Sequence, residues 1–306
     1  MTAERVGVAA QVACLLEASA PKPGNVHPGA AFADARYEDF LLSAAAIGPA
    51  MAAAGVVGVG ATIRRAVEDT RRVVAANTNL GIVLLLAPLA KATALADAAA
   101  PPDAVAGRDA AAERDVGGDA RPAALRDALR RVLAGLTVED AREAYTAIRL
   151  TAPGGLGEAA EQDVRHEPTV TLREAMALAA ERDSVAREYV TDYAVTFERT
   201  VPALERGRRA GLDWPDAIVQ AYLEVLAAAP DTLVARKRGR EVAEQVSGEA
   251  HRALEAGGMH SDAGRHAVAE LDRAWRDDAN AKNPGTTADL VAAGLFVLCW
   301  TERGVI

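Results

Sequence analysis

The segment 283-NPGTTADLVAAGLFVL-298 contains one charged residue, Asp289, and is otherwise strongly apolar after its Pro-Gly turn. Such a run predicts a helix that lies at the centre of the protein, away from water. Either Thr286 or Thr287 can cap this helix, and Asp289 in the first turn suits the positive end of the helix dipole. The alternative interpretation of Asp289 is functional, as a carboxylate held at the mouth of a buried helix bundle.

The rest of the chain repeats the helical pattern on both sides of a few polar loops. No stretch alternates strictly between apolar and polar residues, so the sequence predicts an all-α fold. Thr137–Asp140 and Thr171–Glu174 have the pattern of capping boxes that begin helices. Apolar residues recur at helical spacing in 4–20, 38–54, 61–75, 80–97, 122–134, 138–149, 171–209, 215–228, 232–256, 263–279 and 287–301.

Composition favours one closely packed helical unit. Half of the 306 residues are hydrophobic and only 4% are aromatic, with alanine and leucine dominant. We therefore predict a single multi-helix bundle domain over residues 1–306. The segment 98–121 is poor in bulky apolar residues and rich in Ala, Asp, Gly and Pro, which predicts a mobile insertion.

Charge and apolar patterning limit the expected partners and location. A net charge of −9 argues against binding to nucleic acid or to an anionic membrane. The first residues lack a signal-peptide pattern, and the apolar run 80–96 contains Pro88 and Lys91 and is judged too short to span a bilayer. A cytoplasmic protein is expected, with a homo-oligomer left open. Cys14 and Cys299 match no metal or redox spacing and are predicted to be buried thiols.

The loop 20-APKPGNVHPG-29 is the first candidate for chemistry. Its prolines favour extended backbone before them, and Gly24 permits close approach of a ligand to the main chain. Lys22, Asn25 and His27 then present an ammonium, an amide and an imidazole, which suits an anionic ligand. An ordinary turn that ends a helix is the equal alternative.

Two more glycine-containing segments can contact phosphate. In 76-ANTNLGI-82, Asn77 or Thr78 can cap the following helix, whose free amides are suited to phosphate. In 154-GGLGEAAEQD-163, glycine amides stand beside carboxylates, a combination that fits magnesium next to a polyphosphate. A solvated charged turn is the alternative there. The second segment is neither a P-loop nor a dinucleotide fingerprint, because it lacks both the terminal Gly-Lys-Ser/Thr and a preceding strand.

The segment 231-DTLVARKRGRE-241 places Asp231 at an expected helix start, with Arg238 seven positions later on the same helix face. Arg240 is better interpreted as part of a solvated charged surface. The histidine spacing supports no zinc or di-iron site, and the Gly-x-Ser-x-Gly of serine hydrolases is absent from the sequence.

Taken in order, these motifs resemble the triphosphoribosyl-dephospho-CoA synthase family. The resemblance runs from about residue 5 to 301. It comprises Pro-Lys-Pro-Gly at 21–24, Asn-Thr-x-x-Gly at 77–81, Gly-Glu-Ala at 157–159, Asp-Thr at 231–232 with Arg-Gly at 238–239, and Asn-Pro-Gly-Thr at 283–286 with Ala-Asp at 288–289.

The resemblance implies an all-helical pentosyltransferase. The family reaction moves a triphosphoribosyl group from ATP to 3′-dephospho-CoA and releases adenine, with Mg²⁺ as the expected cofactor. The implied catalytic residues are Lys22, Glu158, Asp231 and Asp289, of which Glu158 and Asp289 would hold magnesium. The implied nucleotide-binding residues are Pro23, Gly24, Asn25, His27, Asn77, Thr78, Gly81, Gly155, Gly157, Arg238, Asn283, Gly285 and Thr286.

The sequence also departs from the better-known bacterial enzymes. Those carry a basic pair where this chain has Asn79 and Leu80, and Leu-Val-Asp where it has 25-NVH-27. Their last motif reads Ser-Pro-Gly-Gly-Ser-Ala-Asp, against 283-NPGTTAD-289 here. Two alternatives therefore stay open: the same chemistry on a different acceptor, and a nucleotide-binding regulatory protein without catalysis.

Overall fold

The structure is a computed structural model that describes residues 2–99, 120–151, 157–276 and 280–301. Within these ranges it contains helices and no strand, which confirms the all-α prediction. The longer helices are α1 (Ala3–Ser19), α2 (Tyr37–Ala53), α3 (Val59–Arg71), α4 (Leu80–Ala99), α6 (Ala120–Ala134), α7 (Val138–Thr151), α10 (Val201–Arg209), α11 (Trp214–Ala228), α13 (Arg240–Glu255), α14 (Asp262–Trp275) and α15 (Gly285–Thr301). The shorter elements are α8 (Leu172–Ala179), α9 (Ser184–Val190), η2 (Thr196–Thr200), α12 (Thr232–Arg238) and η3 (Gly258–His260).

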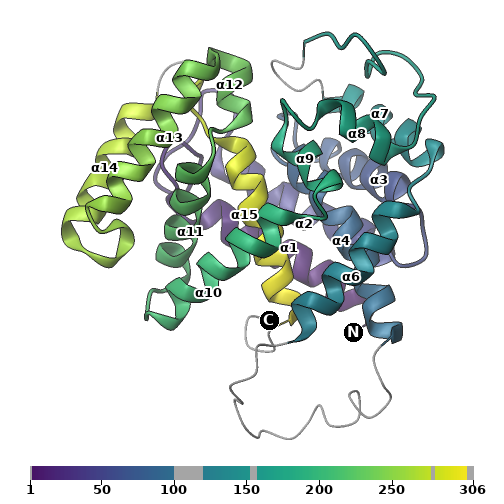
Figure 1. Ribbon diagram of the computed structural model, residues 1–306, viewed down its shortest axis with the longest axis horizontal. Helices are drawn as coiled ribbons and strands as arrows, with labels where there is room; N and C mark the ends of the chain where they lie inside the picture. Colours follow the sequence, from purple (N-terminus) through teal and green to yellow (C-terminus); the bar gives the residue numbers. More distant parts are fainter. Residues whose placement is uncertain (1, 100–119, 152–156, 277–279, 302–306) are drawn as a thin grey trace, which may run out of the picture.

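The predicted central helix is α15, and it lies between two groups of helices (Figure 1). It packs against α1, α4 and α11, with α13 and α14 farther out on one side and α3, α6 and α7 on the other. Every residue from Thr286 to Thr301 is buried except Asp289. The exception matters because it places a carboxylate at an opening in an otherwise closed interior.

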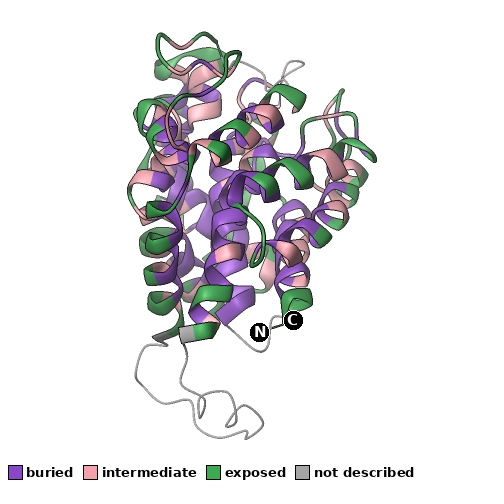
Figure 2. Ribbon diagram, turned by 90° about the vertical axis from the view of Figure 1, so that its right-hand side faces the viewer, coloured by how far each residue is buried: buried purple, intermediate pink, exposed green. Residues whose placement is uncertain are grey.

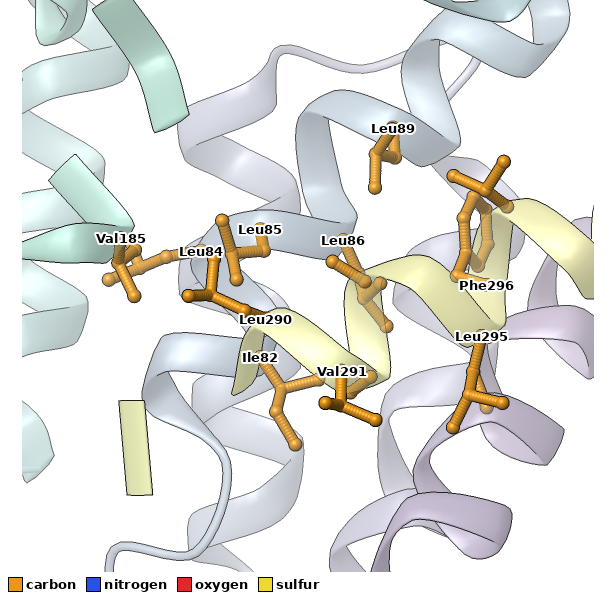
Figure 3. Close-up of a cluster of buried hydrophobic side chains, with 14 of the residues drawn as sticks. Ile82, Leu84, Leu85, Leu86, Leu89, Val185, Leu290, Val291, Leu295 and Phe296 are labelled. Atoms are coloured by element: carbon orange, nitrogen blue, oxygen red, sulfur yellow. The ribbon is translucent and has the colours of Figure 1, made fainter. Parts of the chain in front are cut away.

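Helix α4 forms the second half of this core. Figure 3 shows leucines of α4, among them Leu86 and Leu89, on the side of Val291 and Phe296 of α15. Those four side chains are completely buried, and each stabilises the fold by about 1.5–3 kcal/mol relative to an exposed side chain.

One expectation about α4 was wrong. The helix continues through Pro88 and Lys91, and the 19-residue span Leu80–Ala98 is long and apolar enough to cross a membrane. Since 72% of its apolar window is buried inside the protein, it also meets the description of a core helix.

Buried residues gather on the inner helices and exposed residues on the outward faces (Figure 2). The buried side chains join into one hydrophobic cluster that draws on helices from both groups, including the predicted buried thiols of Cys14 and Cys299. One domain over residues 1–306 stays a prediction, which this common core supports.

Local signals decide where the predicted helices begin and break. Both capping boxes are confirmed, through reciprocal bonds between Thr137 and Asp140 and between Thr171 and Glu174. The segment 171–209 is divided into several helices, and the segment 232–256 is broken at Gly239, whose φ is 90°. The predicted insertion 98–121 lies outside the described residues except for its ends, which belong to α4 and α6.

Candidate functional site

A cavity of about 830 Å³ opens where the N-terminal ends of α4, α9, α12 and α15 meet. Its volume is within the usual range of small-molecule sites. Phe32, Phe40, Ile148 and Met176 supply part of an apolar wall. The polar and charged residues in the wall are Glu17, Asn25, Asp34, Asn77, Thr78, Asn79, Thr151, Asp183, Arg236, Lys237, Asn280, Asn283, Thr286 and Asp289.

The starts of the two core helices give one part of the cavity a positive character. The wall includes Leu80 and Gly81 from the first turn of α4, and Gly285 and Thr286 from the first turn of α15. Asn77 caps α4 as predicted, since its Oδ1 accepts the amide of Leu80 at 3.3 Å. Helix N-termini attract phosphate because of their amide hydrogens and their dipoles.

Asp289 is the carboxylate of α15 that lines this cavity; it lies in the second turn of the helix, which begins at Gly285, and not in the first turn as predicted. It lies against Gly81, where an added Cβ would be 2.0 Å from Asp289 Oδ2. This close approach explains why a glycine stands at that point of the Asn-Thr-x-x-Gly motif. Burial raises the pKa of Asp289 well above its usual range, and the negative charges of Glu17, Asp231 and Asp183 add to the effect.

Asp231 holds two helices at the site but does not line the cavity. Its Oδ1 accepts the amides of Leu233 and Val234 and so caps α12. Its Oδ2 accepts both the amide and the hydroxyl of Thr287 at 2.7 Å, which fixes the start of α15. Burial raises the pKa of Asp231, against the effect of these hydrogen bonds. The geometry gives Asp231 a structural function at the edge of the site.

Lys22 is completely buried and does not face the cavity. Its Nζ lies 2.9 Å from Glu17 Oε1 and donates to the main-chain carbonyls of Glu17 and Ala20. The ammonium therefore contacts a carboxylate of this chain where the sequence suggested a phosphate. Glu17, which the sequence analysis did not single out, does line the cavity.

The remainder of the first loop is held against α14. The amide of Gly24, whose φ is 73°, donates to Asp272 Oδ1, and His27 Nε2 lies 3.6 Å from Asp272 Oδ2. Burial acts to raise the pKa of Asp272, but His27, Arg276 and the Gly24 amide outweigh it and lower the pKa to about 2. Of this loop's predicted residues only Asn25 reaches the cavity wall; Pro23, Gly24 and His27 do not.

The polar side chains in the segments 77–79 and 283–286 differ in whether they already have a hydrogen-bond partner. Thr78 is bonded to Ser43, and Asn79, which replaces a basic residue of the better-known enzymes, donates to Thr70 at 3.1 Å. Asn283 Oδ1 is buried and has no hydrogen-bond partner among the described residues. An unsatisfied buried oxygen in a cavity wall suits a ligand donor or a cation.

The structure does not bring Glu158 or Arg238 to the cavity. Glu158 is 77% exposed and pairs with Arg165, and Arg238 is exposed at the end of α12. Gly157 is exposed with a φ of 67°, and Gly155 lies outside the described residues. Arg236 occupies the cavity wall instead of Arg238 and pairs with Asp183.

Arg236 and Glu17 are the two cavity residues that the sequence prediction missed. Arg236 lies two positions before Arg238, and because successive helix residues point about 100° apart, this changes the face completely. Glu17 lies within the apolar pattern of α1, where a buried glutamate is rare unless it is paired. Among the described residues no group of three or more metal-binding side chains is preassembled.

A family model matches this chain over nearly its whole length, and known proteins match parts of it. The sequence model of the family described as ATP:dephospho-CoA triphosphoribosyl transferase (CitG) matches residues 3–304. A protein of Pseudomonas savastanoi pv. phaseolicola, assigned as a 2-(5″-triphosphoribosyl)-3′-dephosphocoenzyme-A synthase, is 32% identical over 167 residues, which are 48% of this chain and 57% of that protein. The Klebsiella pneumoniae 2-(5″-triphosphoribosyl)-3′-dephosphocoenzyme-A synthase is 35% identical over 97 residues, or 32% of this chain and 34% of that one.

A solved structure agrees with these sequence matches. The crystal structure of a protein from Archaeoglobus fulgidus, assigned as a triphosphoribosyl-dephospho-CoA synthase, superposes with a TM-score of 0.60 at 27% identity. The superposition covers 84% of this chain and 96% of the other. The two curated relatives, by contrast, are matched over only 57% and 34% of their length. On the match over residues 3–304, the chain belongs to the ATP:dephospho-CoA triphosphoribosyl transferase family.

Proposed function

We propose that this protein transfers a 5-triphosphoribosyl group from ATP to 3′-dephospho-CoA and releases adenine. Family membership over residues 3–304 is the observation that carries the proposal. A hydroxyl of the acceptor attacks C1′ of the ATP ribose, the bond from C1′ to adenine breaks, and the triphosphate stays on the sugar. The transition state has oxocarbenium character, by analogy with glycoside transfer.

The cavity offers complementary surfaces to such a substrate. The N-termini of α4 and α15, together with Arg236, can bind the triphosphate, and this partly replaces the basic pair absent at Asn79 and Leu80. The apolar wall with Phe32 and Phe40 suits the flat face of a nucleobase. This arrangement supports a nucleotide oriented with its phosphates toward the core helices.

Magnesium fits the oxygen atoms that the cavity presents. Mg²⁺ is commonly held by one or two carboxylates together with substrate phosphates and water, so a preassembled protein cage is not needed. Asp289 and the unpartnered Oδ1 of Asn283 are the proposed protein ligands. When bound, the ion would neutralise part of the triphosphate charge. Glu158, predicted as the other ligand, lies outside the cavity wall.

One incubation tests the proposal. The protein is mixed with Mg²⁺ and ATP, with and without dephospho-CoA, and free adenine is measured by chromatography. Adenine that appears only with dephospho-CoA, together with a triphosphoribosylated product by mass spectrometry, is the expected result. Adenine with a cell extract but not with dephospho-CoA would indicate another acceptor. ATP binding with no adenine in either case would favour a regulatory protein.

The setting of this activity is also part of the proposal. We place the protein in the cytoplasm, where ATP and coenzyme A precursors are available. Size-exclusion chromatography with light scattering will decide between a monomer and a homo-oligomer.

A further inference from the structure

Glu17 is an acidic side chain in the cavity wall that the proposed reaction has not yet used. It lies in the last turn of α1, is only 4% exposed, and still contributes to the cavity surface. Lys22 contacts one carboxylate oxygen, Oε1, at 2.9 Å. Within the parts of the chain that the structure describes, Glu17 Oε2 has no hydrogen-bond partner. That oxygen is therefore available to a group in the cavity.

Glu17 contacts Lys22 on one side and lines the cavity on the other. Lys22 is fully buried behind it and is held by main-chain carbonyls of the same turn, so the lysine cannot move into the cavity without losing these bonds. Its positive charge balances the charge of the carboxylate at a point shielded from water. Burying a carboxylate is costly unless it is paired with a cation or fully hydrogen-bonded, and Lys22 supplies such a cation here.

The other carboxylates of the cavity wall are less suited to accept a proton. Asp183 uses Oδ1 to cap α9 and Oδ2 to bind Arg236. Asp34 lies exposed at the rim and accepts from Asn280 at 3.4 Å. Asp289 is the proposed magnesium ligand; burial raises its pKa, and the negative charge of Glu17 adds to the effect.

We propose that Glu17 is the general base that takes the proton from the attacking hydroxyl of the acceptor, and that Lys22 is a positioning residue that keeps this carboxylate ionised and fixed. The inference rests on the proposed pentosyl transfer. As the bond between the hydroxyl oxygen and C1′ forms, the hydroxyl proton passes to Glu17. The C1′–N9 bond breaks with its electron pair going to adenine, and the proton is then returned, directly or through water, to the leaving base.

Charge-neutral variants distinguish this role from a purely structural ion pair. Glu17→Gln should lower kcat by about 10²–10⁴-fold, the usual contribution of a general base, with little change in KM for ATP. It leaves the Lys22 ammonium unpaired, so its melting temperature should also fall. The double variant Glu17→Gln/Lys22→Met removes both charges and should recover much of that melting temperature while remaining inactive. Glu4→Gln, the same change at an exposed position of α1, is the matched control.

The pH–rate profile gives a second measurement. The acidic limb of kcat/KM in the wild type should be absent from the residual activity of Glu17→Gln. The profile of Lys22→Met should also differ from that of the wild type, because the carboxylate loses the neighbouring charge that holds it in place. A merely structural pair would change stability without moving this limb.

The outcomes separate this inference from the proposed function. A double variant that folds and turns over like the wild type, or Glu17→Gln with wild-type kcat, would overturn the base assignment while leaving the transfer reaction intact. If the double variant does not fold, Glu17→Asp decides, since it keeps the charge but withdraws the carboxylate: unchanged kcat would contradict the proposal. A wild-type protein that releases no adenine with any acceptor would overturn both.

Discussion

At the scale of single residues, Asp289, the proposed magnesium ligand, is a carboxylate held at a cost to stability. It is a carboxylate in the second turn of a helix that is otherwise buried, and three other acidic groups lie near enough to repel it. A bound cation would relieve this repulsion. The positive end of α15 alone does not remove it, because the pKa of Asp289 remains raised.

Asp289→Asn should therefore stabilise the free protein and weaken its binding of Mg²⁺–ATP. Because the folded-state pKa is raised, the stability contribution of Asp289 is present at low pH and is lost as pH rises from about 4, the ordinary carboxylate value, through the raised pKa. The advantage of the variant in melting temperature should thus grow with pH. Calorimetry should show Mg²⁺–ATP binding at least about tenfold weaker, or ~1.4 kcal/mol. An Asn variant that binds Mg²⁺–ATP normally would remove Asp289 from the site.

Gly81→Ala should displace the Asp289 carboxylate. The added methyl would lie 2.0 Å from Oδ2, so one of the two groups must move, at about 1–3 kcal/mol for an overpacked site. Adenine release should fall more than about tenfold, the equivalent of ~1.4 kcal/mol. Gly248→Ala in α13 is the matched control, because its nearest new neighbour is 3.7 Å away and it should keep full activity. Normal turnover in Gly81→Ala would contradict the proposed importance of this contact.

At the scale of secondary structure, the site depends on helix ends that are tied to each other. Asp231 joins the start of α12 to the start of α15. Its bonding partner in α15, Thr287, lies 56 positions later in the sequence. One side chain thus orients both helix N-termini. This explains why Asp-Thr at 231–232 accompanies the final motif, which is distant in sequence but in direct contact in the structure.

Asp231→Ala should remove two helix caps at once. Each cap contributes about 0.5–2 kcal/mol, so the free energy of unfolding should fall by roughly 1–4 kcal/mol, and ligand binding should weaken with the loosened start of α15. Urea denaturation measures the first effect. Asp213→Ala, which removes one exposed cap of α11, should cost about 1 kcal/mol and leave binding unchanged. If both variants behave alike, Asp231 has no special function.

At the scale of the whole molecule, the cavity is formed by segments that are distant in sequence. Residues of α1, of the segment before α4, of α9, of α12 and of α15 all contribute to its wall. A ligand that contacts them simultaneously must bind the folded state and not the unfolded chain. Binding should therefore stabilise the entire fold.

Mg²⁺–ATP should raise the melting temperature as one cooperative transition. At a free concentration of 100 times Kd the expected stabilisation is about 2.7 kcal/mol. Differential scanning calorimetry checks this, with adenosine plus Mg²⁺ as the control that lacks the triphosphate. Equal stabilisation by adenosine would show that the helix N-termini and Arg236 do not bind phosphate.

The sequence predicted the fold well because the information is local. Helical periodicity, capping boxes and one uniformly apolar segment sufficed to predict the helical class and the central position of α15. The breaks within 171–209 and at Gly239 were missed, since the apolar pattern continues across them; positive φ at Asp192, Tyr193 and Gly239 marks two of these breaks. The prediction that the apolar run 80–96 is too short to span a bilayer was wrong, because Pro88 was taken to interrupt a helix that in fact continues through it.

The structure brings together only some of the predicted site residues. By itself the sequence determined which segments carry polar residues beside glycine, and Asn25, Asn77, Thr78, Asn283 and Asp289 from those segments do line one cavity. Only the tertiary structure decided that Lys22 turns inward to Glu17, that Asp231 caps two helices, and that Arg236 replaces Arg238. The physical reason is that a charged side chain binds whichever opposite charge or helix end lies nearest after packing, and sequence spacing does not specify that neighbour.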